Sequence, residues 1–166
     1  AKWSLYGGYV ALIVLPFVIS FVMYSSYEEK EDPCEFVLLQ PNIEPYQDKF
    51  NFLSRNQQDD ILFNLAQKGV TPNTRFMIGP ETFTWHINED NPYTLSTVKR
   101  MKMFVDEHPN TDFILGAVTM KRYQTRNAPT STAKKGRGYW YDTFNASVHM
   151  DTSGKCEFFH KSKLVV

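Results

Sequence analysis

A carboxylate suited to proton transfer stands at Glu81, directly after the apolar run Phe76-Met-Ile78 and the pair Gly79-Pro80. The apolar run is typical of a short buried strand. A residue that follows such a strand lies at the carboxyl edge of the sheet, where open α/β sheets place their sites. Glu81 is therefore a candidate general acid or base. An exposed turn residue is the alternative for this pattern alone.

Two further polar residues are candidates for chemistry at the same site. Lys161 ends the segment Phe159-His-Lys161, and an ammonium beside a reacting carbonyl can stabilise the oxyanion that forms there. Asn145 lies inside a strand-like segment and offers an amide for binding. The alternatives are a solvated lysine and an amide whose hydrogen bonds stay within the strand.

Neither a metal site nor a nucleic-acid interface is indicated. Cys34 and Cys156 are far apart and the four histidines are scattered, so no metal-ligand spacing occurs. The chain has 18 basic and 18 acidic residues, whereas phosphate binding needs clustered positive charge. The cluster Lys134-Lys135-Gly-Arg137 is interpreted as a solvated loop. We expect no metal, no cofactor and no nucleic-acid partner.

A membrane helix is predicted over residues 1–27, because no charged residue occurs from Trp3 to Tyr27. A helix needs about 20 mostly apolar residues to cross the hydrocarbon of a bilayer. Pro16 is tolerated in such helices, and tyrosines near both ends suit the interfaces. A secretory signal peptide and a buried core helix are the alternatives. The positive-inside rule compares one lysine before the helix with one shortly after it. It therefore gives only a mild preference for the rest of the chain to lie on the extracytoplasmic side of the membrane.

The rest of the chain is predicted to be a charged linker over 28–34 and one domain over 35–166. Its expected strands are 36–39, 76–78, 113–115, 139–150 and 155–160, and its expected helices are 48–68 and 91–108. The turn at 151–154 makes the last two strands a hairpin, and 124–138 is expected to be a loop. This order indicates an α/β domain with helices over a sheet.

Taken together, these segments resemble the carbon–nitrogen hydrolase (nitrilase) superfamily, whose catalytic residues are Glu, Lys and Cys in that chain order. The family glutamate follows a hydrophobic strand in a Pro-Glu pair, as at Pro80-Glu81. The family lysine lies in a context such as His160-Lys-Ser-Lys-Leu164, after a strand with an asparagine and a glycine-containing turn, as from Asn145 to Lys155. The resemblance implies part of a nitrilase-like α-β-β-α sandwich, with Glu81 and Lys161 as catalytic residues.

Within the superfamily, the membrane helix points to the apolipoprotein N-acyltransferase branch, which has several membrane helices and an extracytoplasmic catalytic domain. The segment Phe36-Val-Leu-Leu-Gln-Pro-Asn-Ile43 is similar to its opening strand, and Lys49-Phe50 stands where members often carry Lys-Trp. This branch implies an acyltransferase of the bacterial inner membrane, with its catalytic domain on the periplasmic side. It moves a fatty acyl chain from a phospholipid, through a cysteine thioester, to the N-terminal amine of a lipoprotein.

Phe50, Trp85 and Asn145 are the candidates for substrate binding in that scheme, and core packing is the alternative for Trp85. Glu81 is expected to act as base and acid with a pKa raised by partial burial. No cysteine follows Lys161, so we expect the chain to be a piece of a longer protein whose nucleophile lies after Val166.

Two other functions remain open from the sequence. A hydrolase of the same superfamily would cleave a small amide or nitrile, although such enzymes are usually soluble. A membrane-tethered domain without enzymatic activity would bind a partner, and its Glu81 and Lys161 would then point to unrelated surfaces.

Overall fold

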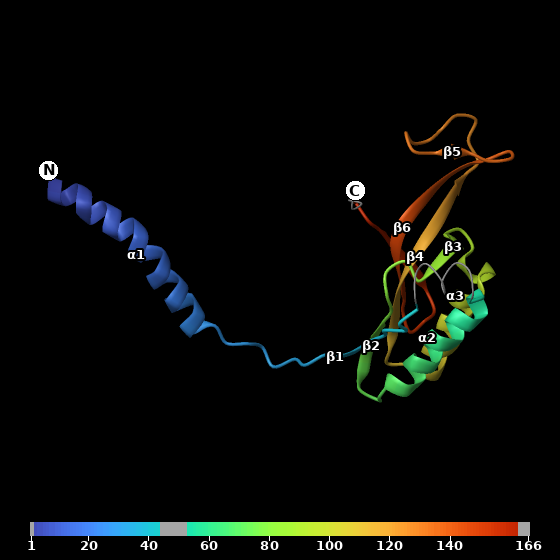
Figure 1. Ribbon diagram of the computed structural model, residues 1–166, viewed down its shortest axis with the longest axis horizontal. Coiled ribbons are helices and arrows are strands. Elements are labelled where there is room, and N and C mark those ends of the chain that lie inside the picture. Colours follow the sequence, from blue (N-terminus) through green and yellow to red (C-terminus); the bar gives the residue numbers. More distant parts are fainter. Residues whose placement is uncertain (1, 44–52, 163–166) are drawn as a thin grey trace. The chain divides into compact units, whose positions relative to one another are not determined.

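The computed structural model describes residues 2–43 and 53–162 of the 166-residue chain (Figure 1). Its contacts divide the chain into two compact units, Ala1–Pro33 and Cys34–Val166. The boundary falls inside the predicted linker over 28–34. The first unit contains one long helix, and the second contains a mixed sheet with helices.

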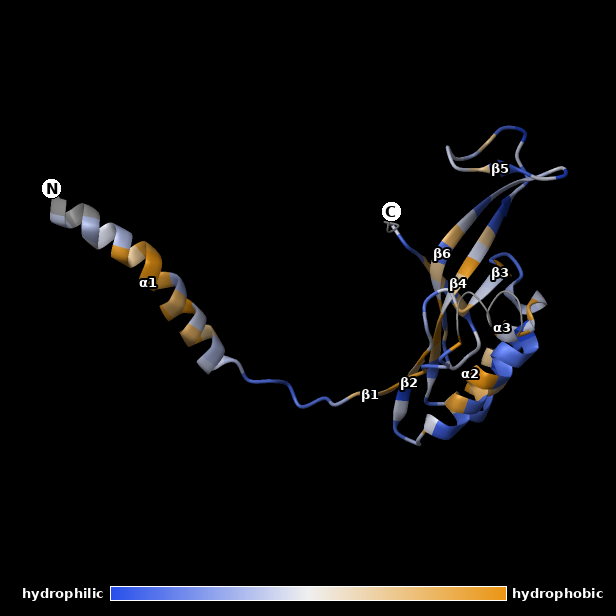
Figure 2. Cartoon of the chain, in the orientation of Figure 1, coloured by the Kyte–Doolittle hydropathy of each residue, from blue (hydrophilic) through white to orange (hydrophobic). Residues whose placement is uncertain are grey.

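The first unit is formed by helix α1, Lys2–Ser26, which is apolar through its middle (Figure 2). The side chains of α1 whose burial is described, among them Leu12 and Phe17, are exposed rather than buried in a core. Among the described residues, α1 is the one helix that is long and apolar enough, over Tyr6–Ser26, to cross a membrane by length and composition. A helix that is apolar all round needs an apolar environment, which a bilayer provides.

The second unit is built on a seven-stranded sheet. The strands are β1 (Glu35–Leu38), β2 (Thr74–Ile78), β3 (Thr84–Asn88), β4 (Asp112–Tyr123), β5 (Lys134–Lys135), β6 (Trp140–Met150) and β7 (Cys156–His160). β1, β2 and β4 run parallel, and β3 pairs in parallel with β4 beyond the end of β2. β6 runs antiparallel to β4, and β5 and β7 pair antiparallel with β6. The predicted α/β class and the predicted C-terminal hairpin are confirmed.

Two helices, α2 (Arg55–Gly69) and α3 (Ser96–Glu107), cover one face of this sheet (Figure 1). α2 begins later than the predicted residue 48, and residues 48–52 lie outside the described part of the chain. The start at Arg55 follows from a capping box, in which the backbone of Gln57 donates to the Ser54 hydroxyl and the backbone of Ser54 donates to the Gln57 side chain.

The helix predicted from residue 91 is divided in the structure. A short 3₁₀ turn, η2 (Pro92–Thr94), comes first, and α3 starts only after Leu95. The amide of Leu95 donates to the carbonyl of Pro92, which closes the 3₁₀ turn before the α-helix begins.

The core lies between the two helices and the face of the sheet that they cover. Its fully buried members from α2, α3, β2, β4 and β6 include Leu62, Met77, Met101, Phe113, Leu115 and Val148. Burial of a side chain of this size stabilises a fold by about 1.5–3 kcal/mol. This packing holds β2, β4 and β6 rigidly enough to position side chains at their edges.

The opposite face of the sheet carries apolar side chains that remain exposed. Phe36 and Leu38 of β1 are 56% and 60% exposed, and Phe159 of β7 is 60% exposed. One sheet with helices on one face corresponds to one half of the predicted α-β-β-α sandwich. The sandwich itself stays a prediction.

Strand β3 was not expected from the sequence, and β4 is longer than the predicted run 113–115. The two departures have one cause. β4 continues past the end of β2, and its extension pairs with Thr84–Asn88 on the same edge. A pairing of this kind depends on the tertiary fold and leaves little local signal in the sequence.

Candidate active site

The loop that carries Glu81 connects β2 to β3, and both of these strands pair with β4. Ile78 of β2 stands opposite Ile114 of β4, and Thr84 of β3 stands opposite Ala117. The segment Gly79–Phe83 therefore stands opposite only two residues of β4. The surplus backbone must bulge out of the ladder, and Glu81 lies in the middle of this bulge.

The bulge is fastened to β4 on both sides of Gly116. The amide of Gly116 donates to the carbonyl of Pro80 at 3.1 Å, and the amide of Phe83 donates to the carbonyl of Gly116 at 2.8 Å. A Cβ atom at Gly116 would lie 2.5 Å from Cα of Glu81, so only glycine allows this approach. Thr82 takes a positive φ of 51°, which turns the chain after Glu81. The backbone thus determines where the carboxylate projects.

Three of the predicted site residues meet at the carboxylate of Glu81. Its Oε1 atom accepts hydrogen bonds from Nζ of Lys161 and from Nδ2 of Asn145, both at 2.9 Å. The amide of Lys161 also donates to the carbonyl of Asn145 at 2.8 Å, which continues the β6–β7 pairing by one residue. A non-enzymatic domain with unrelated surfaces would separate these side chains by about 15 Å, beyond direct or one-water contact.

The alternation of strand side chains explains why Lys161 and Asn145 share a face. Phe159 stands opposite Ser147 in the hairpin, so residues 145, 147, 159 and 161 project to one side. This is the face of the sheet opposite the helices. There they line a hollow of about 350 Å³ together with Glu81, and Ile78 and Ile114 contribute apolar surface. The charged pair therefore borders an apolar hollow.

The pKa of Glu81 is lowered, not raised as the sequence suggested. The hydrogen bond from Lys161 is the main cause, followed by the hydrogen bond from Asn145 and the positive charge of Lys161. Burial opposes these effects only weakly, because the side chain is 64% exposed. Glu81 is thus ionised at neutral pH, and the lowered pKa makes it a weaker base.

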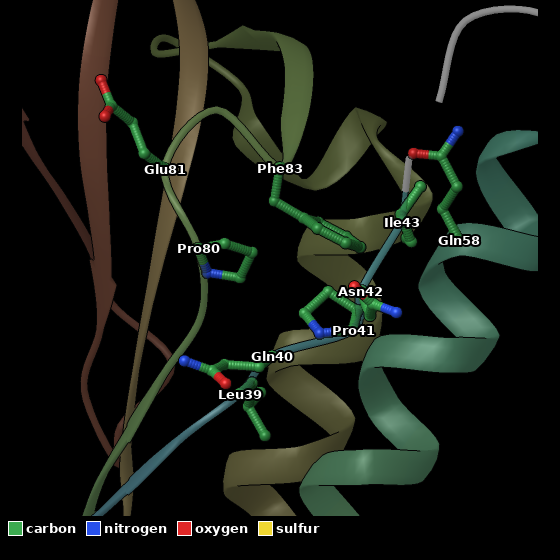
Figure 3. A pocket seen from close by; sticks show the side chains of 9 residues that line it. All are labelled: Leu39, Gln40, Pro41, Asn42, Ile43, Gln58, Pro80, Glu81 and Phe83. Atoms are coloured by element: carbon green, nitrogen blue, oxygen red, sulfur yellow. The ribbon is translucent and has the colours of Figure 1, made fainter. Parts of the chain in front are cut away.

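A second cavity, of about 330 Å³, lies on the other side of Pro80 (Figure 3). Its walls are formed by Leu39–Ile43, Gln58 and Phe83, and Glu81 contributes to one edge. In Figure 3 the Glu81 side chain points away from Phe83 and from the segment at Ile43. The carboxylate of Glu81 therefore points toward the hollow on the face of the sheet opposite the helices. The loop that carries Glu81 separates that hollow from the second cavity.

Trp85, another predicted substrate-binding residue, is not brought to this site. The guanidinium of Arg55 lies over the Trp85 ring, 5.1 Å from its centroid, and Trp85 lines neither of the two cavities. Phe50 lies outside the described residues. Phe83, in the same stretch as Trp85, lines the second cavity instead. The roles proposed for Phe50 and Trp85 stay predictions.

Neither cysteine of the chain lines the two cavities. Cys34 is exposed just before β1, and Cys156 is half-buried at the start of β7. Burial, with a smaller contribution from Asp151, raises the pKa of the Cys156 thiol to about 11. A thiol with such a pKa is a poor nucleophile at neutral pH. No group of three His, Cys, Asp or Glu side chains suited to a metal occurs within residues 2–43 and 53–162.

One contact beside the site was not anticipated from the sequence. Nε2 of His160 lies 2.6 Å from Oε1 of Glu89, which also accepts from the Thr119 hydroxyl at 2.6 Å. The His160 ring stacks on Phe144 at 3.7 Å between centroids. Since His160 precedes Lys161, this arrangement holds the end of β7 from the face opposite the site.

Neither the scan of protein-family models nor the search of curated proteins finds a match to this chain, so the contacts of Glu81, Asn145 and Lys161 are the ground on which a function is argued.

Proposed function

We propose that this chain carries the glutamate and the lysine of a membrane-bound acyltransferase of the carbon–nitrogen hydrolase type. In this proposal the acyltransferase moves a fatty acyl chain from a phospholipid to the N-terminal amine of a lipoprotein. The observation that carries the proposal is the convergence of Lys161 and Asn145 on one carboxylate oxygen of Glu81. Acyl transfer needs proton movement and oxyanion stabilisation, and a carboxylate and an ammonium can supply these two functions.

In the first step, Glu81 takes the proton of a cysteine thiol and the thiolate attacks the ester carbonyl of the donor. The carbon–sulfur bond forms as the carbon–oxygen bond of the ester breaks. The leaving alkoxide of the lysophospholipid receives the proton that Glu81 has just accepted. Glu81 starts as a carboxylate, as this step requires, although its lowered pKa makes it a weaker base than a buried glutamate would be.

In the second step, the acceptor amine attacks the carbonyl of the thioester. The carbon–nitrogen bond forms as the carbon–sulfur bond breaks, and Glu81 removes the proton from the amine and passes it to the leaving thiolate. The ammonium of Lys161 lies beside Glu81, where it can stabilise the negative charge on the carbonyl oxygen in both steps. The apolar surface from Ile78 and Ile114 suits an acyl chain beside the reacting carbonyl.

The nucleophile in this scheme is neither Cys34 nor Cys156. The half-buried Cys156 has a raised pKa, and Cys34 precedes the first strand of the sheet. The lipid substrates give α1 a role, because a helix that crosses the bilayer keeps the domain near its donor. The proposal places the domain on the periplasmic side of the bacterial inner membrane.

The test uses the full-length gene product in proteoliposomes, with a phospholipid donor and a diacylated lipopeptide acceptor. Mass spectrometry of the lipopeptide should show one added acyl chain. Glu81→Gln should lower the rate by about 10²–10⁴-fold, and Lys161→Met by about 10²–10³-fold. The matched controls are Glu157→Gln and Lys155→Met, an exposed ion pair at 2.7 Å on the same hairpin. These controls should leave the rate unchanged.

Two results would replace this proposal with its alternatives. Hydrolysis of a small amide without acyl transfer would identify an amidase that uses the same residues. Equal rates for Glu81→Gln and for the unmodified protein would remove Glu81 from the chemistry.

A further inference from the structure

Positive charge is concentrated where β4 ends and β6 begins, although the net charge of the whole chain is zero. The segment 121–141 has six basic residues and no acidic one. They are Lys121, Arg122, Arg126, Lys134, Lys135 and Arg137, and all six are exposed. Because the whole chain has a net charge of zero, the remaining residues carry a net charge of −6. We call this segment the basic loop.

None of these six side chains forms an ion pair with a carboxylate in the part of the chain that the structure describes. Aromatic rings lie beside two of them instead. The Arg122 guanidinium lies 5.0 Å from the centroid of the Tyr139 ring, and the Lys135 ammonium lies 6.0 Å from that of Trp140. The positive charges are thus available to an external anion, and half-buried aromatic rings accompany them.

The basic loop is held in place by a buried carboxylate. Asp142 accepts hydrogen bonds from the hydroxyls of Thr130 at 2.7 Å and Thr132 at 2.8 Å. Burial alone would raise the pKa of Asp142, but these bonds and one from Tyr123 outweigh it and lower the pKa. The indole of Trp140 also donates to the carbonyl of Arg126. The charges are therefore presented by a defined segment at one end of the sheet, which includes β5 (Figure 1).

We infer that the basic loop binds the anionic headgroups of a membrane surface. Lysine and arginine side chains near such a surface are attracted to its phosphates, and Trp and Tyr side chains favour the interfacial region. The tether between α1 and β1, residues 27–34, reaches at most roughly 30 Å. A bilayer that holds α1 thus keeps the domain at a high effective concentration near the headgroups. This inference does not depend on acyl transfer.

Single-stranded nucleic acid is the other polyanion that basic and aromatic side chains bind. A membrane is favoured because the same chain carries a helix that meets the requirements for crossing one. The experiment separates the two.

The intact chain is reconstituted in vesicles through α1, with a fluorophore on the basic loop. Ser131→Cys is labelled in a Cys34→Ser background, since the half-buried thiol of Cys156 reacts poorly at neutral pH. Quenching by a nitroxide-headgroup phospholipid reports contact of the loop with the surface. Vesicles that contain phosphatidylglycerol should give strong quenching that high salt weakens, and pure phosphatidylcholine vesicles should give little.

Neutralisation of three charges should release the loop from the surface. The variant is Arg126→Gln, Lys134→Gln and Arg137→Gln. The loss is roughly fivefold in the binding equilibrium for each charge, so about a hundredfold for three. The matched control neutralises three exposed basic residues elsewhere in the domain, Lys68→Gln, Arg75→Gln and Lys99→Gln. This control should retain the quenching, and circular dichroism should show both variants folded.

Three outcomes would overturn the inference. Quenching that is equal in neutral and anionic vesicles would show that lipid charge is not recognised. Quenching that survives the loop variant would remove these residues from the interaction. Binding of a single-stranded oligonucleotide that competes with anionic vesicles and is lost in the loop variant would assign the surface to nucleic acid.

Discussion

Nζ of Lys161 and Oε1 of Glu81 lie 2.9 Å apart, although 80 positions separate the two residues in the sequence. The sheet produces this contact. Glu81 leaves β2 in a bulge fastened to β4, Asn145 lies on β6 next to β4, and Lys161 follows β7 next to β6. The contact between Lys161 and Glu81 thus depends on the correct pairing of β2, β4, β6 and β7. The pKa of Glu81 therefore reports whether these strands are paired as described.

Replacement of Lys161 by methionine should raise the pKa of Glu81. The hydrogen bond from Lys161 is the main cause of the lowered value, so its loss moves the pKa back toward 4.5. A carboxyl with a lowered pKa in the folded state contributes stability above its unfolded pKa, and this is lost as pH falls through the folded pKa. The acid limb of the stability profile should therefore flatten in Lys161→Met. Carbon-13 NMR titration of the glutamate side chains in micelles measures the shift.

The matched control for this titration is Lys155→Met. Lys155 lowers the pKa of Glu157 by the same kind of hydrogen bond and makes no contact with Glu81. Its removal should raise the pKa of Glu157 and leave the titration of Glu81 unchanged. An unaltered Glu81 titration in Lys161→Met would show that the two side chains are not paired in solution.

Substitution of Gly116 by alanine should destabilise the domain and displace Glu81. The new methyl would meet backbone atoms only, at 2.5 Å from Cα of Glu81 and 2.6 Å from the carbonyl oxygen of Pro80. Neither can move without breaking the bonds that fasten the bulge. Overpacking of this kind destabilises by about 1–3 kcal/mol or more. Urea unfolding followed by tryptophan fluorescence in detergent measures the loss.

Gly79→Ala provides a graded comparison on the same loop. Its new methyl would meet the end of the Leu115 side chain at 2.4 Å, and a side chain adjusts more readily than a backbone. It should therefore destabilise less than Gly116→Ala and leave the pKa of Glu81 low. Equal losses for the two variants would contradict the role assigned to Gly116.

Local pattern in the sequence predicted the strand end and the hairpin on which the candidate site residues lie. The apolar run before Gly79-Pro80 marked the end of a strand and placed Glu81 at a sheet edge. The turn at 151–154 and the two flanking strands predicted the hairpin, and alternation along that hairpin brings Asn145 and Lys161 to one face. The strand end and the hairpin could be predicted because their signals lie within a few residues of each other. Asn145 and Lys161 were singled out through the family resemblance, and their roles stay predictions.

The features that the sequence did not predict depend on contacts between distant segments. The expectation of a raised pKa for Glu81 assumed burial, whereas the bulge leaves the side chain exposed to solvent and in contact with Lys161. The bulge exists because the extension of β4 pairs with β3. No local sequence pattern predicts this pairing. Gly116 was visible in the sequence, but a glycine at the end of an apolar run did not indicate which segment approaches it.

A third prediction concerns the buried carboxylate of Asp59. The Thr97 hydroxyl lies 3.0 Å from each of its carboxylate oxygens and stabilises a group that is fully buried between α2 and α3. Burial raises the pKa of Asp59, and Thr97→Val removes the hydrogen bond that limits this effect. The variant should lose about 1–3 kcal/mol of stability at neutral pH, since the charge is left unsatisfied.

The sign of the pH dependence distinguishes this cause from a packing defect. With a folded pKa above 3.8, the native state binds more protons than the unfolded state, so stability falls as pH rises between the two pKa values. The penalty of Thr97→Val should accordingly be smaller in acid, where Asp59 is protonated. Thr143→Val, at an exposed position of β6, is the control and should change stability little at any pH. A penalty for Thr97→Val that is equal at both pH values would point to packing alone.

A last prediction concerns His160, which makes two separable contacts beside the site. Its Nε2 atom lies 2.6 Å from Glu89, and its ring is stacked on Phe144 with an angle of 3° between the planes. His160→Phe keeps a ring for stacking and loses the polar contact, whereas His160→Ala loses both. We expect losses of about 1 kcal/mol for the phenylalanine variant and about 2 kcal/mol for the alanine variant in urea unfolding.

The same variants show whether His160 positions its neighbour Lys161. If the end of β7 is held by His160, the alanine variant should loosen Lys161 and raise the pKa of Glu81 part of the way toward the value in Lys161→Met. The phenylalanine variant should preserve most of the lowered pKa, because the stack on Phe144 still anchors the strand end. A Glu81 titration that is unchanged in both variants would limit His160 to stability. The positioning of Lys161 would then rest on its backbone bond to Asn145.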